Sequence, residues 1–462
     1  TMKVKTISRS ADTYVPARNT QELAMPRNLN PALHPFERAR EYTRAVTATK
    51  LERMFAQPFV GQMGDGHRDG IYCISKNFQA TNQVASGSGD GVVKYWNMSS
   101  RDEAVSFRAH FGMVTGLAVT PRRGLLSCGD DKSIKLWSLQ TGDFGETDDL
   151  DVYRKSGNTT GLLKTFSGEH AFQGLDHHFT DDIFVTGGAA IQLWNMSRTN
   201  YVSNLSWGAD NVTRVKFNKT ETNVLASCGS DNSIVLYDIR TNTPVQKVVT
   251  ALRPNSLAWN PMEAYTFASG HDDHNAYLWD MRDLSKSLNV YKDHVSAVTD
   301  LDFSPTGKEL VTGSYDKTIR IFRTREGHSR EIYHTKRMQR VFAVAYTTDA
   351  RYILSGSDDA NLRLWRANAL ERLNVKSARE RSKLNYDNKL KERYKYMPEV
   401  RRISRHRHLP SVVKKAQEIK RVETESLKRR EENDRMNRKD GSRPRVPERQ
   451  KHIRGTAWKE SS

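Results

Sequence analysis

Alternating apolar and polar residues recur in short runs along most of the chain, and each run closes on an aromatic residue. Alternation with period two is the pattern of a half-buried β-strand. A Ser or Thr close to a Gly leads into each run, and in six of the seven copies an Asp follows that Ser or Thr four positions later. The closing aromatic residues are Trp96, Trp137, Trp194, Tyr237, Trp279, Phe322 and Trp365.

The spacing of these copies predicts the fold. The closing aromatics are separated by 41, 57, 43, 42, 43 and 43 residues. A period in the low forties with this signature is typical of WD repeats, each of which forms a four-stranded blade. We therefore predict an all-β fold, a seven-bladed WD40 β-propeller over residues 61–366. Residues 1–60 form an extended and helical N-terminal arm, and residues 367–462 form a basic, helical C-terminal extension and tail.

Most conspicuous polar residues belong to the repeat itself. A blade of this kind carries a hydrogen-bonded chain of His, Ser or Thr, Asp and Trp, and such a buried chain is stable when every member has a partner. We assign three sets to this scaffold role: His67, Ser86, Asp90 and Trp96; His110, Ser127, Asp131 and Trp137; and His294, Thr312 and Asp316 with Phe322. Arg337 occupies the His position of the seventh copy, and the fourth and fifth copies have no aligned His.

The third copy is irregular. It has lost its Asp and follows the 57-residue step, whose extra length lies near residues 141–160. This insert is rich in carboxylates, and a solvated loop is the simplest interpretation, although binding of a cation or a basic partner stays open.

The two flanking regions do not follow the repeat. Residues 25–35 contain three prolines and should lie extended, whereas a helix is expected from Pro35 to about Met54. Its predicted face consists of Phe36, Ala39, Thr43, Val46 and Lys50. Residues 367–397 and 411–437 are rich in helix formers, and the second of these segments has an apolar stripe at Val412, Ala416, Ile419 and Val422.

Charge separates these regions from the repeats. The formal net charge of +19 consists of −2 over residues 61–365, +5 over residues 1–60 and +16 over residues 366–462. A neutral scaffold with cationic arms suits binding to a polyanion, although solvated charged helices remain the alternative. The candidate contacts are Arg401, Arg402, Arg405, His406, Arg407 and His408, with Lys414 and Lys415 beyond them and Arg27, Asn28 and Asn30 in the N-terminal arm. A nuclear-import signal explains the basic runs equally well.

Several classes of protein are disfavoured. The three cysteines are too few for a disulfide framework, and Cys128 and Cys228 occupy equivalent repeat positions as small buried side chains. No signal peptide or membrane-spanning run is expected, which indicates an intracellular, reducing compartment. No phosphate-binding Gly-x-x-x-x-Gly-Lys-Ser/Thr motif and no His/Cys set with metal-ligand spacing occurs. We therefore expect no enzymatic activity, no cofactor, no metal and no small-molecule substrate.

Four stretches resemble the Sof family of WD-repeat proteins: residues 25–51, residues 328–338, residues 390–408, and the continuation at residues 414–420. This resemblance covers nearly the whole chain. It implies a nucleolar, non-catalytic assembly factor of the small-subunit processome. The implied partners are pre-ribosomal RNA, a guide small nucleolar RNP and other processome proteins, and the free protein is expected to be a monomer. It also implies a role in pre-rRNA processing within the nucleus.

A second function remains open. Propellers that serve as substrate receptors of cullin-RING ubiquitin ligases often carry Asp-x-Arg after the closing aromatic residue. Asp238 and Arg240 form this motif in the fourth copy, and Asp280 and Arg282 form it in the fifth. An Asp–Arg bridge that merely fixes the end of each blade is the simpler interpretation.

Overall fold

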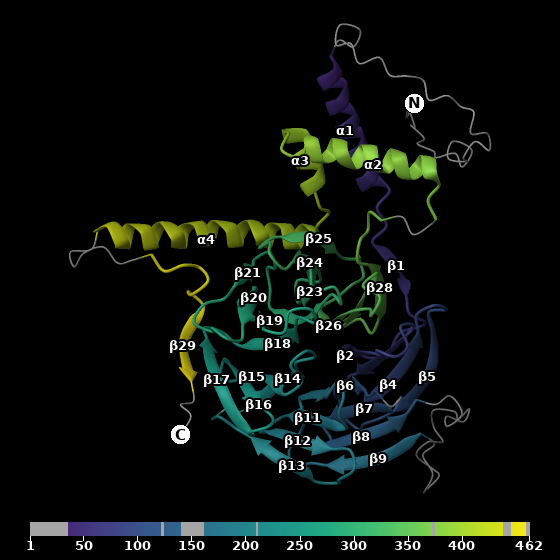
Figure 1. Cartoon of the computed structure of the whole chain (residues 1–462), viewed down its shortest axis with the longest axis vertical. Helices are drawn as coiled ribbons and strands as arrows, with labels where there is room; N and C mark the ends of the chain where they lie inside the picture. The colour runs from purple at the N-terminus through teal and green to yellow at the C-terminus, as the bar shows by residue number, and fades with distance from the viewer. Residues whose placement is uncertain are drawn as a thin grey trace. The chain divides into compact units, whose positions relative to one another are not determined.

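The structure is a computed structural model that describes residues 36–121, 124–139, 161–208, 211–371, 375–437 and 445–458. Contacts divide the chain into two compact units, and each is described by itself. The larger unit contains residues 59–367 and the chain from residue 409 onward, and it is the predicted seven-bladed propeller (Figure 1). The smaller unit combines residues up to 58 with residues 368–408. This division differs from the three consecutive segments that the sequence suggested.

Every blade is an antiparallel sheet whose strands pair in the order in which they follow along the chain, apart from the last strand of blade 7. Blade 1 contains β2 (Ile71–Lys76), β3 (Gln83–Ser88), β4 (Val92–Asn97) and β5 (Asp102–Arg108). Blade 2 contains β6 (Val114–Val119), β7 (Gly124–Gly129), β8 (Ser133–Ser138) and β9 (Leu162–Ser167). Blade 3 contains β10 (Gly174–His177), β11 (Ile183–Gly187), β12 (Ile191–Asn195) and β13 (Tyr201–Leu205).

The remaining blades follow the same plan. Blade 4 contains β14 (Val212–Phe217), β15 (Val224–Gly229), β16 (Ser233–Asp238) and β17 (Thr243–Thr250). Blade 5 contains β18 (Pro254–Trp259), β19 (Thr266–His271), β20 (Ala276–Asp280) and β21 (Asn289–Tyr291). Blade 6 contains β22 (Val298–Phe303), β23 (Glu309–Ser314), β24 (Ile319–Arg323) and β25 (Ser329–Tyr333). Blade 7 contains β26 (Val341–Tyr346), β27 (Tyr352–Ser357), β28 (Leu362–Arg366) and β1 (Phe59–Gln62).

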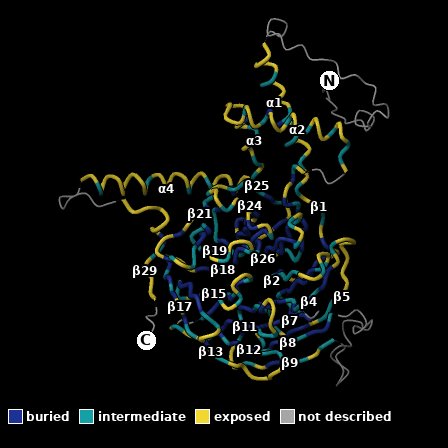
Figure 2. The backbone as a smooth tube through the Cα atoms, in the orientation of Figure 1, coloured by how far each residue is buried: buried dark blue, intermediate teal, exposed yellow. Residues whose placement is uncertain are grey.

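The ring closes through both ends of the repeat region. The first strand of every blade contacts the first strands of its two neighbours, from β2 through β26 and back to β2. In blade 7 the outer strand is β1, which precedes all the repeats in sequence and pairs antiparallel with β28. Phe59 lies opposite Trp365, and their rings meet edge to face at 5.2 Å. Figure 2 shows that buried positions gather in the sheets of the ring.

A tight turn after the motif Asp joins the second and third strands of six blades. The residue after that Asp adopts a left-handed backbone conformation in each case: Gly91, Lys132, Asn232, His274, Lys317 and Ala360. In blade 1 a Cβ on Gly91 would lie 2.1 Å from the carbonyl oxygen of His110, so only glycine fits there. Blade 3 lost this Asp in sequence, and its turn is correspondingly shorter.

The C-terminal part of the chain returns to the propeller. Helix α4 (Ser411–Asn437) is followed by β29 (Ile453–Trp458), which pairs antiparallel with β17 as a fifth strand of blade 4. Near β29, the ring of His452 stacks on Tyr277 at 3.7 Å, and the Nζ of Lys420 on α4 donates to the carbonyl oxygen of His294 at 2.7 Å. The sequence did not predict this fifth strand.

The smaller unit contains three helices: α1 (Glu37–Met54), α2 (Ala378–Arg393) and α3 (Pro398–Arg405). The helix expected near residues 35–54 is confirmed. On its predicted face, Phe36, Ala39, Thr43 and Lys50 are exposed and Val46 packs partly buried against the core of this unit, whereas Ala45 and Thr49 are buried. The small side chains on α1 allow α2 and α3 to approach it closely. The sequence of the N-terminal arm, which contains no repeat, did not predict this packing.

Two further observations concern the C-terminal helices. The basic block between the two expected helices is partly helical, because α3 extends to Arg405. In the apolar stripe of α4, Val412, Ile419 and Val422 are exposed and Ala416 is half buried, while Val413, outside the stripe, is buried. Among the described helices, none is both long and apolar enough to cross a bilayer. Cys128 and Cys228 are buried and unpaired, as predicted, and Cys73 is buried and unpaired as well.

Candidate nucleic-acid interface

The three helices α1, α2 and α3 form a small module that we call the helical module. Its core consists of Ala45, Leu390 and Val400, one from each helix, and the rings of Tyr42 and Tyr394 meet beside it at 5.9 Å. Ion pairs join α1 to α2 at the edges of this core: Lys391 to Glu52 at 2.8 Å and Arg393 to Glu41 at 2.8 Å. Arg53 donates to the carbonyl oxygen of Ser404 at 2.8 Å, which holds the end of α3 against α1.

The predicted basic block lies at the end of α3 and directly after it. Arg401, Arg402, Arg405 and His406 are exposed, and Arg402 pairs with Glu399 at 2.9 Å, an exposed contact of small energy. Arg407 is half buried and donates to the carbonyl oxygens of Ser404 and His406, whereas His408 is exposed. The block therefore has an outward group of bases and one inward arginine that bonds to the backbone.

The helical module carries more positive charge than the block alone. The described residues of the smaller unit, which contains this module and the segments that join its helices, include 17 Lys and Arg against 8 Asp and Glu. Arg38, Arg40 and Arg44 on α1 are exposed, although sequence reasoning did not select them. They lie more than 330 residues before the basic block, and only the packing of α1 on α2 and α3 brings them into one module. No local signal in the sequence could have paired them.

The other predicted contacts lie elsewhere. Lys414 and Lys415 are exposed on α4 in the propeller unit, so they do not belong to the helical module. Arg27, Asn28 and Asn30 lie outside the described residues, as does the insert at 141–160. Tyr396 is 83% exposed, whereas Tyr394 packs in the module and donates to Glu41 at 3.0 Å.

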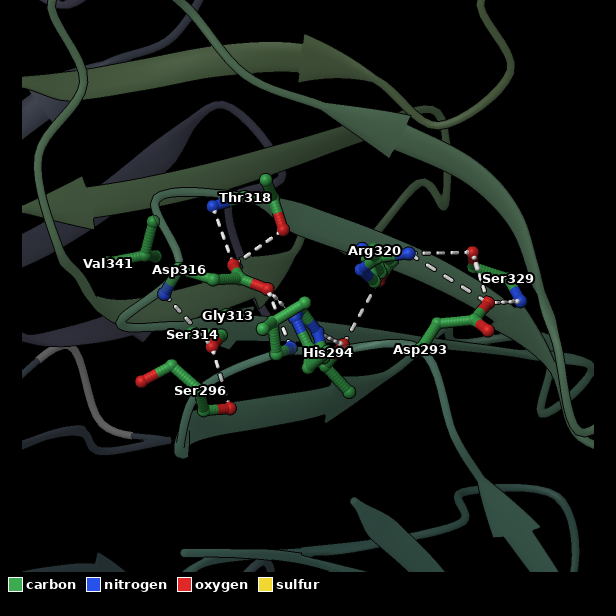
Figure 3. Close-up of polar contacts among 12 residues, drawn as sticks. Asp293, His294, Ser296, Gly313, Ser314, Asp316, Thr318, Arg320, Ser329 and Val341 are labelled. Carbon is green, nitrogen blue, oxygen red and sulfur yellow. Dashed lines mark hydrogen bonds and ion pairs between the residues drawn. The ribbon is translucent and has the colours of Figure 1, made fainter. Parts of the chain in front are cut away.

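The polar chain of blade 6 includes His294 and Asp316 (Figure 3) and has Phe322 in place of the Trp. His294 Nε2 lies 2.7 Å from Thr312 Oγ1, and His294 Nδ1 lies 2.9 Å from an oxygen of Asp316. Asp316 also accepts from the backbone N–H and hydroxyl of Thr318. Burial by itself raises the pKa of the Asp316 carboxyl, but His294 and Arg320 together hold this pKa well below its ordinary value. His294 and Asp316 are both buried, so this network stabilises the blade and leaves neither group exposed to react with a substrate.

The same chain is whole in blade 2 and interrupted in blade 1. In blade 2, Trp137 donates to Ser127 at 3.0 Å, and His110 joins Ser127 to Asp131. In blade 1, Trp96 donates to Ser86 at 2.7 Å and His67 Nε2 lies 2.6 Å from the same hydroxyl, but His67 Nδ1 has no hydrogen-bond partner among the described residues. Burial lowers the pKa of His67 to about 4, so the ring is neutral.

Blades without an aligned His use a side chain of a neighbouring strand instead. Lys247 pairs with Asp231 in blade 4 at 2.9 Å, and Tyr277 donates to Asp273 in blade 5. In blade 7 the partner of Asp359 is Arg363. Arg337, which aligned with the missing His, is exposed, so sequence alignment selected the wrong arginine.

The two Asp-x-Arg motifs form ion pairs within their own turns. Arg240 Nη2 lies 3.3 Å from Asp238, and Arg282 Nη2 lies 2.9 Å from Asp280. The arginine side chains are 70% and 64% exposed, so the pairs cap the blade ends and still present both guanidinium groups to solvent. Across the part of the chain that the structure describes, no group of three His, Cys, Asp or Glu side chains is placed to hold a metal ion.

Comparisons with known proteins agree with these features. A model of the Sof1-like domain matches residues 367–453. A model of the WD domain, G-beta repeat, matches residues 60–97, 102–138, 200–238, 247–280, 285–323 and 325–366. The interval from 139 to 199, between the second and third of these segments, holds the insert and most of the irregular blade 3.

Full-length relatives give the same result. The chain is 62% identical to Protein SOF1 of Saccharomyces cerevisiae over 470 residues, which cover 99% of this chain and 96% of that protein. It is 46% identical to the DDB1- and CUL4-associated factor 13 of Danio rerio and 44% identical to that of Homo sapiens, with 98% of this chain and 99% of each relative covered. The predicted propeller and the helical segments that flank it are thus shared along the whole length, and the chain belongs to the Sof1-like family of WD-repeat proteins.

Proposed function

We propose that this protein is a non-catalytic assembly factor of the small-subunit processome. In this role it acts in the nucleolus, where it contacts pre-ribosomal RNA and the guide small nucleolar RNP and supports pre-rRNA processing. The family resemblance supports this role, and the single observation that carries the RNA contact is the exposed basic surface of the helical module. Three exposed arginines of one short segment, Arg401, Arg402 and Arg405, stand on a packed scaffold there.

Charge and burial together explain why a helical module suits this role. A positively charged surface attracts phosphate without reading sequence, and Arg offers two parallel hydrogen bonds to a phosphate group. The buried core of Ala45, Leu390 and Val400 holds the helices in place, so the arginines need not lose much freedom when RNA binds. The propeller contributes a neutral body whose blades are available to protein partners.

The experiment uses point substitutions in the full chain. Deletion from residue 398 onward would also remove β29 and His452 from the propeller, so its effect would be mixed. The triple variant Arg401→Ala/Arg402→Ala/Arg405→Ala keeps both units. Its matched control, Arg198→Ala/Arg325→Ala/Arg351→Ala, removes three exposed arginines of the propeller.

The measurement is the affinity for a transcript of small-subunit pre-rRNA at several salt concentrations. Loss of three phosphate contacts lowers the slope of log affinity against log salt by about 2, at roughly 0.7 per phosphate on a single strand. The control variant should keep the slope of the unmodified protein. Equal slopes for both variants would refute the assigned RNA contact, as would unchanged co-sedimentation of the triple variant with large pre-ribosomal particles.

A second function, as substrate receptor of a cullin-RING ubiquitin ligase, is supported by a separate observation. Arg240 and Arg282 are both exposed on adjacent blades, and the relatives at 44–46% identity are named as DDB1- and CUL4-associated factors. The test is recovery of the ligase adaptor with the full-length protein from cell extract. Recovery should fall at least tenfold for Arg240→Ala/Arg282→Ala and stay constant for Arg198→Ala/Arg325→Ala, whereas equal recovery from both variants sinks this function.

A further inference from the structure

A hollow lies at the centre of the propeller and involves all seven blades. Its volume is about 380 Å³, and residues from the first strand of every blade line it. The segments directly after β2, β6, β10 and β14 form its mouth, including Phe78, Pro121, Phe179 and Lys219. The mouth therefore lies on the face where the first strands end. The ends of the third strands, which carry Arg240 and Arg282, lie on this same face, because successive strands of a blade run in opposite directions.

Positive charge in this hollow exceeds the negative charge available to balance it. Lys76 pairs with Asp302 at 2.5 Å, and Lys216 pairs with Asp176 at 3.1 Å. Lys219 is the third ammonium group and has no ion pair among the described residues.

Each of these two carboxylates also accepts a backbone N–H besides the ammonium group of its lysine. One oxygen of Asp302 also accepts from the backbone N–H of Tyr346 at 2.8 Å. The second oxygen of Asp176 accepts from the backbone N–H of Phe217 at 2.8 Å. An incoming anion is therefore the natural partner for the third ammonium group.

Aromatic surface surrounds this unpaired cation. The Nζ of Lys219 lies 4.1 Å from the centre of the Phe78 ring, a cation–π contact. Phe78 and Phe179 meet edge to face at 6.2 Å, and each is 48% exposed at the mouth. In the lining of the hollow, His177 Nε2 is buried and has no hydrogen-bond partner among the described residues. The site thus combines an unpaired cation, exposed apolar rings and an unsatisfied polar atom.

We propose that this hollow binds a protein segment that presents one carboxylate beside an apolar or aromatic side chain. The carboxylate pairs with Lys219, and the adjoining side chain packs against Phe78 and Phe179. A single carboxylate fits better than a run of phosphates, because Asp176, Asp300 and Asp302 also line the hollow and repel a polyanion. The site uses only the propeller, so it does not depend on the RNA contact proposed for the helical module.

Protonation of Lys219 adds a measurable signature. Burial, followed by the charge of Lys76, lowers the pKa of Lys219 to about 7, while Asp302 and Asp176 raise it and Lys216 lowers it further. Arg214 and Asp300 are the other charged groups of the hollow, and His177 and His178 stand at its wall. A bound carboxylate favours the ammonium form, so binding should take up a proton and weaken as the pH rises from 7 to 9.

The experiment selects peptides and then tests their dependence on Lys219. A random phage-displayed dodecapeptide library is selected on the full-length protein, and the enriched peptides are synthesised with a fluorescent label. Fluorescence anisotropy then gives affinities for the unmodified protein, Lys219→Met, Lys219→Arg and Phe78→Ala. Lys308→Met is the matched control, because Lys308 is exposed on the loop after β22, at the same face but outside the lining of the hollow.

The expected result has three parts. Enriched peptides contain Asp or Glu next to an apolar residue, they bind Lys219→Met and Phe78→Ala at least tenfold more weakly, and Lys219→Arg restores most of the affinity. Lys308→Met binds as the unmodified protein does. Peptides that bind Lys219→Met equally well would overturn the proposal, as would a selection with no enrichment.

The same variants separate protein from RNA at this site. Lys219→Met and the unmodified protein should bind a labelled oligouridylate decamer with the same affinity, measured by anisotropy. A tenfold loss of RNA affinity in Lys219→Met would instead assign the hollow to RNA and overturn the peptide proposal. If Lys219→Met lowers the unfolding midpoint, Phe78→Ala still tests the site, because it changes a half-exposed ring.

Discussion

Docking of the C-terminal strand should depend on pH through one histidine. His452 is 5% exposed, stacks on Tyr277 and meets Trp279 edge to face at 5.2 Å, and neither of its ring nitrogens has a hydrogen-bond partner among the described residues. Burial, with a smaller effect of His271, lowers the pKa of His452 from 6.5 to about 4, and Asp273 opposes this shift. Docking of β29 therefore favours the neutral, unprotonated ring of His452.

The sign and size of the effect follow from this pKa. Because the docked pKa is lowered, docking of β29 is strongest above pH 6.5 and is lost as the pH falls from 6.5 towards 4. At about 1.36 kcal/mol per pKa unit, the change from pH 7 to pH 5 weakens docking by about 1.8 kcal/mol, or about 20-fold in the undocked population.

Hydrogen exchange of the β29 amides measures that population once the intrinsic dependence of exchange on pH is removed. His452→Phe is the decisive variant. Phenylalanine keeps a ring against Tyr277, gives up no hydrogen bond and cannot titrate, so β29 should stay protected at pH 5 as it is at pH 7. If His452→Phe loses protection between pH 7 and 5 to the same extent as the unmodified protein, His452 is not the titrating group and the reasoning fails.

Three other substitutions test the helical module, the blade network and the exposed ion pairs. Leu390→Ala should lower the free energy of unfolding of the helical module by about 2–4 kcal/mol, because it empties a buried position, and faster hydrogen exchange in α1 would report it; unchanged exchange would mean that α1 does not depend on this core. Asp316→Asn should cost the propeller about 3 kcal/mol in urea unfolding, since it removes the charge that faces His294 and Arg320, and a loss below about 0.5 kcal/mol would contradict the buried network. Arg240→Ala/Arg282→Ala should leave the unfolding midpoint unchanged, because both guanidinium groups face solvent, and a clear decrease would give these pairs a structural role.

The propeller was predictable because its information is local and repeated. Each copy contains its own alternating strand and closing aromatic, and six of the seven contain the turn Asp, so the period alone indicates seven blades. The partners of Asp231 and Asp359 were not predictable, because Lys247 and Arg363 replace the missing His from different strands. Any nearby cation satisfies a buried carboxylate, and sequence alignment cannot choose among them.

The helical module was predictable only in pieces. Helix propensity located α1 and the C-terminal helices, but α1 packs on α2 and α3 across more than 300 residues of intervening chain. A contact of that separation leaves no periodic mark within either segment. The same limitation hid β29, whose exposed residues gave no strand pattern strong enough to assign it to blade 4.

The pairing of β1 with β28 has a consequence for the order of synthesis. The outer strand of blade 7 leaves the ribosome first among the strands, yet its partner is completed only after all the other blades. The helical module also forms late in synthesis, because α1 needs α2 and α3 to complete its core. A nascent chain that ends before β28 therefore has neither a closed ring nor a complete helical module, and both surfaces are present together only once the chain has passed α3.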